Sequence, residues 1–253
     1  MLKLSGVIIT FNEERNIEKC LQSLVNVVDE IVVVDSFSTD QTKSICQGYK
    51  VKFITQKFLG YIEQKNFALT QASYNHVVSL DGDEALSETL QKSILQLKTN
   101  WQFDGYYANR FNNFCGQWIK YSDWYPNKKL RVFDKTKAEW KGINPHDTIQ
   151  LHHSKAKTGQ LKGDILHWTY QTYQEMDEKS EYFSTIAAKA YFDRGKTAPF
   201  WKLLWNPFWA FFKAFILRLG FLDGKNGFRI CYQTGKITYL KYYKLRQLYK
   251  AGT

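Results

Sequence analysis

A short apolar run that ends abruptly in acids constrains this chain more than any other stretch. Residues 77–80 read Val-Val-Ser-Leu, and Asp81, Gly82, Asp83 and Glu84 follow directly. Such a run predicts a short buried strand, and in an open α/β sheet ligands bind in the crevice beyond the carboxyl ends of the strands. Gly82 lets the backbone bend, so that the flanking aspartates can turn toward one point.

Two close carboxylates repel each other unless a cation lies between them. A hard divalent ion such as Mg²⁺ or Mn²⁺ suits a few oxygen ligands plus water, and these ions usually share a substrate phosphate. The stretch therefore favours a metal-diphosphate site. An Asp-Gly-Asp sequence also occurs in solvated turns, and these residues alone leave that alternative open.

Apolar runs alternate with helical patterns through the first hundred residues. Strands are expected at 4–10, 31–34, 51–54 and 76–80, and helices at 43–48, 60–73 and 87–97. A further helix, capped by Asn12, is expected between the first two strands. This order predicts a parallel, doubly wound sheet. Thr10, Asp35 and Asp81 would then lie along one crevice, since each lies at the end of a strand.

The pattern changes after residue 97. Short aromatic segments at 105–108, 114–120, 130–133 and 163–168 predict strands of a mixed extension, residues 144–147 a loop, and residues 175–194 a long helix. The 253 residues fit one large α/β domain with an appendage. The four cysteines lie far apart and are expected to be free thiols, and the N-terminus shows no secretory signal, which favours the cytoplasm.

Positive charge is concentrated near the C-terminus. The net charge is +11, and residues 196–253 hold eleven Lys/Arg against the single acid Asp223, which gives +10. Residues 199–221 are rich in Phe and Trp, yet charges and Pro207 interrupt them too often for a spanning helix. We expect a domain at 1–195 and a basic aromatic extension at 196–253 that lies in an anionic membrane interface. A helix pair packed on the main domain is the alternative.

Four segments, in this order, resemble the inverting glycosyltransferases of family 2. They are Ile-Ile-Thr-Phe-Asn-Glu at 8–13, Val-Val-Asp-Ser-Phe-Ser-Thr-Asp-Gln-Thr at 33–42, Gln-Lys-Asn at 64–66 and Leu-Asp-Gly-Asp-Glu at 80–84. The resemblance implies an enzyme with the α/β GT-A fold, which has a Rossmann-like, mostly parallel sheet, here followed by a C-terminal amphipathic helical extension.

Three later segments are similar to a narrower branch of that family, which adds a sugar to the inner core of bacterial lipopolysaccharide and is often a β-1,4-glucosyltransferase. They are Asn-Pro-His-Asp at 144–147, the strand that ends at His167, and Leu-Gly-Phe-Leu-Asp-Gly at 219–224.

The resemblance also implies which residues bind the nucleotide. Thr10, Phe11 and Glu13 would line its pocket, and Asp35 would accept a hydrogen bond from uracil. Lys65 stands where the family usually has arginine, so it would contact the base or a phosphate as a point charge rather than as a bidentate fork.

Asp81 would lie beside the ribose and the sugar, and Asp83 would hold Mn²⁺ or Mg²⁺ between the two phosphates. His167 matches a position that completes the metal shell in some GT-A enzymes; a structural histidine is the alternative.

Inverting transfer also needs a carboxylate that takes the proton of the acceptor hydroxyl. Asp147 is the candidate base, although the branch more often has Glu there, and a helix cap or a partner of His146 is the alternative role. Asp123 and Asp134 are its rivals. A basic cluster could meet acceptor phosphates or be solvated surface; it comprises Arg110, Lys128, Lys129 and Arg131.

The leading hypothesis is therefore transfer of a hexose, with glucose expected, from a UDP-sugar to the inner-core heptose of lipopolysaccharide or a similar lipid-linked glycan. The reaction would take place on the inner face of the bacterial inner membrane, without nucleic acid as a partner. A nucleotidyltransferase is one alternative, although no glycine-rich loop follows the first strand. A non-catalytic module that binds nucleic acid or membrane through the basic, aromatic residues 239–249 is another.

Overall fold

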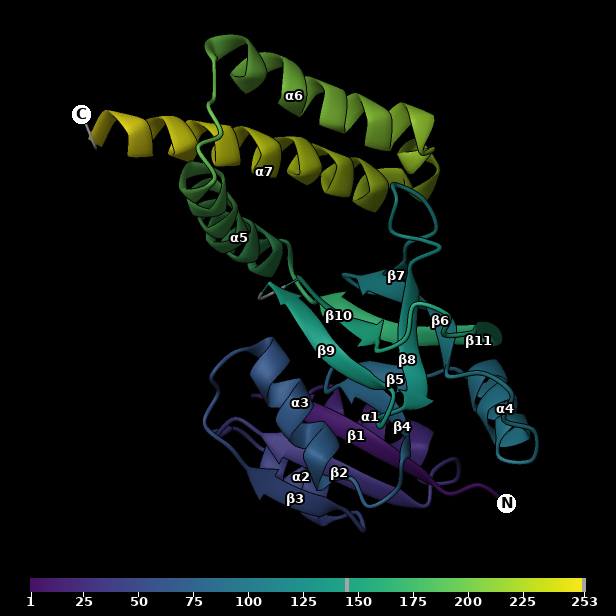
Figure 1. Cartoon of the computed structure of the whole chain (residues 1–253). Helices are drawn as coiled ribbons and strands as arrows, with labels where there is room; N and C mark the ends of the chain where they lie inside the picture. Colours follow the sequence, from purple (N-terminus) through teal and green to yellow (C-terminus); the bar gives the residue numbers. More distant parts are fainter. Residues whose placement is uncertain (144–145, 252–253) are drawn as a thin grey trace. The chain divides into compact units, whose positions relative to one another are not determined.

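The computed structural model describes residues 1–143 and 146–251. The chain forms two compact units (Figure 1). The first unit comprises Met1–Arg110 and Asn127–Trp168, and the second comprises Phe111–Pro126 and Thr169–Thr253.

A mixed β-sheet organises the first unit. Its parallel half has the order β3 (Lys52–Thr55), β2 (Glu30–Asp35), β1 (Leu4–Thr10) and β4 (His76–Asp81). The order continues through β8 (Lys128–Asp134), β6 (Gly105–Phe114), β11 (Thr158–Tyr170) and β5 (Glu84–Leu86). The last residues of β6 and β11 belong to the second unit. A separate two-stranded sheet pairs β9 (Ala138–Ile143) with β10 (His146–Leu151).

Helices cover both faces of the parallel strands, as the alternating sequence predicts. Side chains of α1 (Ile17–Leu24) and α4 (Glu88–Leu97) share one core with Ile8 and Val33. Side chains of α3 (Tyr61–Gln71) share the other core with Val7 and Val32, and α2 (Thr42–Gln47) adds Cys46 to the first. Neighbouring residues of one strand thus enter opposite cores, which is why these strands are apolar throughout.

Three long helices dominate the second unit. Both α5 (Tyr173–Asp193) and α6 (Phe200–Phe212) pack along α7 (Gly224–Ala251), as Figure 1 shows. A π-helical turn (Lys213–Leu217) and a 3₁₀ turn (Gly220–Asp223) connect α6 to α7. The predicted extension at 196–253 thus forms α6 and α7, in one unit with α5. No helix in the described part of the chain is long and apolar enough to cross a membrane.

The structure corrects three local predictions. Asn12 does not cap α1: the residue before α1 is Asn16, and Asn12 has a positive φ of 53° and accepts a hydrogen bond from the amide of Thr39. Residues 114–120 are not one strand, because β6 ends at Phe114, a turn follows, and β7 (Gln117–Trp118) pairs back onto it. Asp147 belongs to strand β10 rather than to a loop; residues 144–145 of that predicted loop lie outside the described residues.

Candidate active site

Three parallel strands end at the same edge of the first unit's sheet. Thr10 pairs with Asp35 in the β1–β2 register, and Ile9 pairs with Asp81 in the β1–β4 register. The three predicted polar residues therefore lie side by side beyond the carboxyl ends of their strands, where α/β sheets bind ligands. The hydroxyl of Thr10 is buried and has no hydrogen-bond partner among the described residues.

The loops after β1 and β2 are tied together at this edge. The buried carboxylate of Asp35 accepts hydrogen bonds from the amide and the hydroxyl of Ser38, and the Ser38 hydroxyl accepts one from the amide of Asn12. The amide of Glu13 donates to the hydroxyl of Thr42 at 2.8 Å. An ionised carboxylate has about four lone-pair sites, so Asp35 keeps acceptor capacity after binding Ser38.

Two aromatic side chains stay exposed on these tied loops. Phe11 is 57% exposed and Phe37, which has a positive φ of 62°, is 60% exposed. Aromatic faces at the mouth of a crevice can stack on a planar base. The resemblance implies a role for Phe11, and the structure adds Phe37, which belongs to the second of the four family-like segments.

Asp81 is clamped between two cations. Its carboxylate lies 3.0 Å from the ammonium of Lys65 and 3.0 Å from the guanidinium of Arg131. Burial opposes ionisation of Asp81, but Lys65 and Arg131 outweigh it and hold the pKa of the carboxyl well below its usual range. Asp81 is therefore charged at every physiological pH.

Lys65 links the strand edge to the β9–β10 hairpin. Its ammonium lies 2.8 Å from the carboxylate of Asp147, while it also contacts Asp81. It lies over the ring of Trp140 at 4.4 Å, and Asn66 fixes the hairpin by exchanging two hydrogen bonds of 2.9 Å with the Trp140 backbone. Asp147, the candidate base, is thus linked to Asp81 through the buried Lys65.

Glu84, to which the sequence assigned no role, organises this cluster. Glu84 is fully buried and accepts a hydrogen bond of 2.8 Å from Arg131, which is only 3% exposed. Its other carboxylate oxygen accepts from the amide of Asp81. Arg131, predicted to meet acceptor phosphates or to be solvated, is instead a buried partner of these acids. A signal is present in the sequence, because Arg131 is flanked in β8 by the apolar residues Leu130, Val132 and Phe133.

Asp83 and His167 come together although they are distant in the sequence. The imidazole Nε2 lies 3.2 Å from the carboxylate of Asp83, because antiparallel pairing of β11 with β5 places His167 opposite Glu84. The backbone carbonyl of Asp83 accepts from the amide of Trp168 at 3.1 Å. The predicted pair is thus assembled by strand register.

The Asp83–His167 pair fits a divalent ion that takes few protein ligands. Carboxylate oxygen is the ligand that Mg²⁺ and Mn²⁺ prefer, and His167 would add an imidazole nitrogen, a ligand more typical of later divalent metals. No group of three His, Cys, Asp or Glu side chains surrounds one point within 1–143 and 146–251. Water and a substrate phosphate would have to complete the shell, as is common for Mg²⁺.

The two rival bases have other partners. Asp134 pairs with His76 at the start of β4, at the opposite end from Asp81, and its carboxylate accepts from Thr136. Asp123 lies in the second unit and pairs with Arg218 at 2.9 Å. Neither belongs to the cluster around Lys65.

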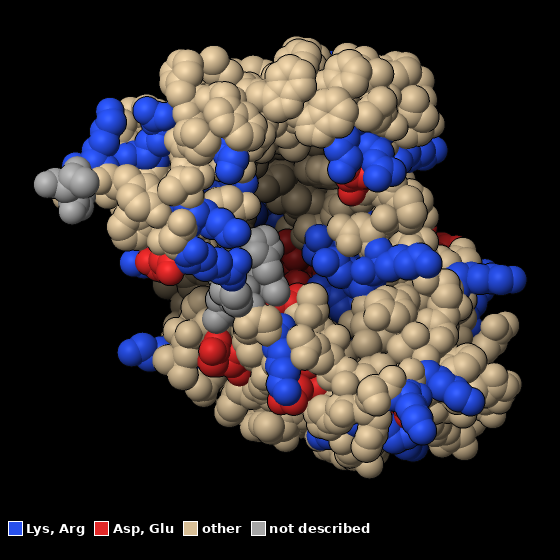
Figure 2. Space-filling view, turned by 45° about the horizontal axis from the view of Figure 1, so that its top comes forward, with Lys and Arg blue, Asp and Glu red and all other residues tan. Residues whose placement is uncertain are grey.

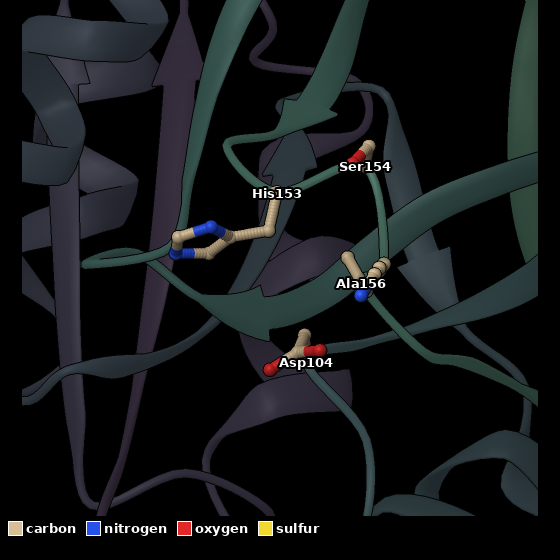
Figure 3. Close-up of a pocket in the computed structure, with 5 residues that line it drawn as sticks. Asp104, His153, Ser154 and Ala156 are labelled. Atoms are coloured by element: carbon tan, nitrogen blue, oxygen red, sulfur yellow. The ribbon is translucent and has the colours of Figure 1, made fainter.

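A pocket of about 370 Å³ in the first unit is separate from this cluster. Figure 3 shows Asp104 and His153 lining it from two different segments. The backbone carbonyl of Asp104 accepts a hydrogen bond from the amide of Asp134. Asp134 in turn pairs with His76 at the amino end of β4. The pocket therefore lies at the opposite edge of the sheet from the strand-end acids.

Comparison with known proteins identifies the family. Residues 5–154, more than half of the chain, match glycosyl transferase family 2. The chain belongs to this family, and it is a glycosyltransferase. An uncharacterized glycosyltransferase of Rickettsia prowazekii is 31% identical over 98% of this chain and 88% of its own length. The lipopolysaccharide core biosynthesis glycosyltransferase LpsC of Rhizobium meliloti is 30% identical over 88% of this chain and 82% of its own.

A solved structure shows the same fold at lower identity. TarS residues 1–349 of S. aureus, crystallised in complex with UDP, superimposes with a TM-score of 0.50 at 16% identity, over 100% of this glycosyltransferase and 92% of that chain. The predicted α/β GT-A fold, with its mixed, mostly parallel sheet and C-terminal helices, is therefore confirmed.

Proposed function

We propose that this glycosyltransferase moves a hexose, with inversion, from a UDP-sugar to the inner-core heptose of lipopolysaccharide or a similar lipid-linked glycan. One observation supports this proposal above the others: Asp35, Asp81 and the Asp83–His167 pair lie at one edge of the sheet, in a chain of family 2. Similarity to LpsC supports the acceptor class, and TarS structures with UDP and with UDP-GlcNAc support a uridine nucleotide. Glucose is the proposed hexose.

The tied loops are the proposed nucleotide site. Thr10, Phe11 and Glu13 would line it, with Asp35 accepting from uracil through its remaining lone pairs. The buried hydroxyl of Thr10, which has no hydrogen-bond partner among the described residues, supports a ligand at this edge, because a buried polar group without a partner is costly. Asp81 would orient the sugar while Lys65 and Arg131 keep it ionised.

Asp83 and His167 would hold Mn²⁺ or Mg²⁺. When bound, such an ion supplies positive charge that stabilises the leaving diphosphate. Lys65 is buried beside Asp81 and would add a positive charge from the protein itself on the same side of the site.

Asp147 is the proposed general base. A general base must lie within reach of the acceptor proton, and the ammonium of Lys65 holds the carboxylate of Asp147 in place at 2.8 Å. The side chain of Asp147 is 9% exposed, which limits competition from bulk water. Because Lys65 contacts both Asp81 and Asp147, it would hold the two carboxylates at a fixed distance.

The acceptor class implies a location. A lipid-linked glycan is available only at a membrane, so the protein would be peripheral on the inner face of the bacterial inner membrane. Its partners would be the UDP-sugar donor, the glycan acceptor and the anionic membrane surface; nucleic acid is not a proposed partner.

Release of UDP from UDP-glucose tests the proposal, measured with Mn²⁺ or Mg²⁺ and with or without a heptose-bearing acceptor. Turnover should require the metal and rise with the acceptor. Asp83→Asn should lower it by about 10²-fold or more, and Asp147→Asn should lower the acceptor-dependent part by about 10²–10⁴-fold, the usual range for a lost general base. Asp104→Asn is the matched control, since Asp104 forms a surface ion pair with Lys137 at the opposite edge.

Unchanged turnover in Asp83→Asn would contradict the proposed metal site. Pyrophosphate formed from UTP and a sugar phosphate, instead of UDP from UDP-glucose, would favour a nucleotidyltransferase. Salt-sensitive binding to oligonucleotides without any sugar transfer would favour the binding module.

A further inference from the structure

Helix α6 exposes apolar side chains where a helix of a globular protein normally exposes polar ones. The exposed positions come in adjacent pairs that repeat every four residues, which places them on one half of the helix. They are Phe200, Trp201, Leu204, Trp205, Phe208 and Trp209, exposed by 45–62%. No residue of α6 is buried.

The exposed apolar area on α6 is comparable with the largest apolar patch of an ordinary monomer. A Phe or Trp side chain presents roughly 150–250 Å², so the five half-exposed aromatic side chains of α6 contribute on the order of 500 Å². Leu204 and, in the following turn, Ile216 and Leu217 add to this, each exposed by at least 42%. The largest apolar patch of a typical monomer is about 300–600 Å² and is often functional.

A groove extends this face onto α7. It has a volume of about 370 Å³ and is walled by Pro207, Phe208 and Phe211 of α6 and by Tyr232 and Tyr239 of α7. Gly235 lies at its floor, where an added Cβ would stand 3.1 Å from the carbonyl of Pro207. The close helix contact that this glycine allows keeps the groove shallow and apolar.

Within residues 196–222 the charges have one sign, whereas Arg218 pairs with Asp123, and Lys236, which also lines the groove, pairs with Asp177. Residues 196–222 contain no Asp or Glu, and the single acid beyond them, Asp223, is buried and accepts hydrogen bonds from the amides of Lys120 and Tyr121. Lys202 and Lys213 form no ion pair with an acid in the part of the chain that the structure describes. Figure 2 shows a broad uncharged surface at the top of the view, where Figure 1 places α6, with Lys and Arg side chains at its borders.

We infer that the α6 face, defined by these six exposed residues and the adjoining groove, docks the protein on an anionic lipid bilayer. The 13 residues of helix α6 span roughly 20 Å, which is too short to cross the ~30 Å hydrocarbon core of a bilayer. The helix therefore lies in the plane of the interface, with its aromatic side chains below the headgroups and its lysines beside lipid phosphates. The inference deepens the proposed membrane location and does not depend on the identity of the sugar.

Sedimentation with lipid vesicles tests this. The full chain should bind vesicles containing anionic phosphatidylglycerol at least tenfold better than vesicles of phosphatidylcholine alone, and salt should weaken the binding. Leu204→Glu should reduce binding at least tenfold. Leu95→Glu is the matched control, because Leu95 is 42% exposed on α4 of the first unit, and it should bind as the wild type does.

Quenching of tryptophan fluorescence by brominated lipids gives a second readout. The degree of quenching should fall when Trp201, Trp205 and Trp209 are all replaced by Phe. Thermal melting of Leu204→Glu should match the wild type, since the side chain is exposed. Wild-type binding by Leu204→Glu, or absence of vesicle binding by the wild type, would overturn the inference. So would a lipid-free oligomer that Leu204→Glu converts to a monomer, because a second copy would then cover the face. Metal-dependent UDP release without vesicles reports on the transferase separately.

Discussion

Removing Arg131 should destabilise the protein more than removing any exposed cation. In Arg131→Met, Glu84 loses its 2.8 Å partner and stays fully buried, with the guanidinium of Arg110 still 3.6 Å away. Asp81 keeps Lys65 at 3.0 Å. Loss of one member of a buried ion pair costs about 3–5 kcal/mol, and because each acid keeps another cation we expect the lower end, about 3 kcal/mol.

Urea unfolding at pH 7, followed by circular dichroism, measures this difference. The thermal midpoint should fall by about 6–12 °C, since about 1 kcal/mol shifts it by 2–4 °C in chains of this size. Lys137→Met is the control: it removes a 2.7 Å pair with Asp104, but Lys137 is 48% exposed, so its loss should lower the stability far less than the loss of Arg131.

A second variant separates the buried charge from packing. Adding Glu84→Gln to Arg131→Met removes the buried negative charge that lost its closest partner and should restore part of the lost stability, as a double-mutant cycle would show. If Arg131→Met unfolds within about 1 kcal/mol of the Lys137→Met control, the buried network does not carry the stability assigned to it here.

Three further variants probe other parts of the first unit. Burial opposes ionisation of Asp29, but Lys98 and other donors lower the pKa of its carboxyl to about 2 from an ordinary 3.8. Asp29→Asn should therefore lower the free energy of unfolding by about 2 kcal/mol at pH 7. Urea titrations at several pH values should show this difference between variant and wild type shrinking as the pH falls from about 4 toward 2. Asn66→Ala, which loses both hydrogen bonds to the Trp140 backbone, should cost about 1–3 kcal/mol and lower turnover if the hairpin positions the base; hydrogen exchange in β9 that matches the wild type would contradict this. Gly163→Ala should lower the melting temperature sharply, because φ is +93° and a Cβ would collide with the backbone of α4; a wild-type melt would refute the argument.

The polar residues at the strand ends could be predicted because they directly follow the apolar runs in the sequence. The apolar runs at 4–10 and 76–80 predicted β1 and β4 closely, and the parallel order then placed Thr10, Asp35 and Asp81 at one edge. The failed predictions are local as well. Asn12 resembles a helix cap in sequence, but its positive φ and its bond to the loop after β2 show that contacts between loops outweigh helix propensity there.

The sequence by itself determined the order of strands and helices, the acids at the strand ends, and the basic, aromatic character of the C-terminal helices, since each is a property of a short contiguous stretch. Only the tertiary structure decided that Arg131 is buried against Glu84, 47 residues away, and that Lys65 holds Asp147, 82 residues away. The same holds for the outward face of α6, which is apolar on its exposed half. The burial of a charge and the choice of its partner depend on which distant strands pair, and hydrophobic periodicity shows which face of a strand is buried but not which distant strand lies beside it.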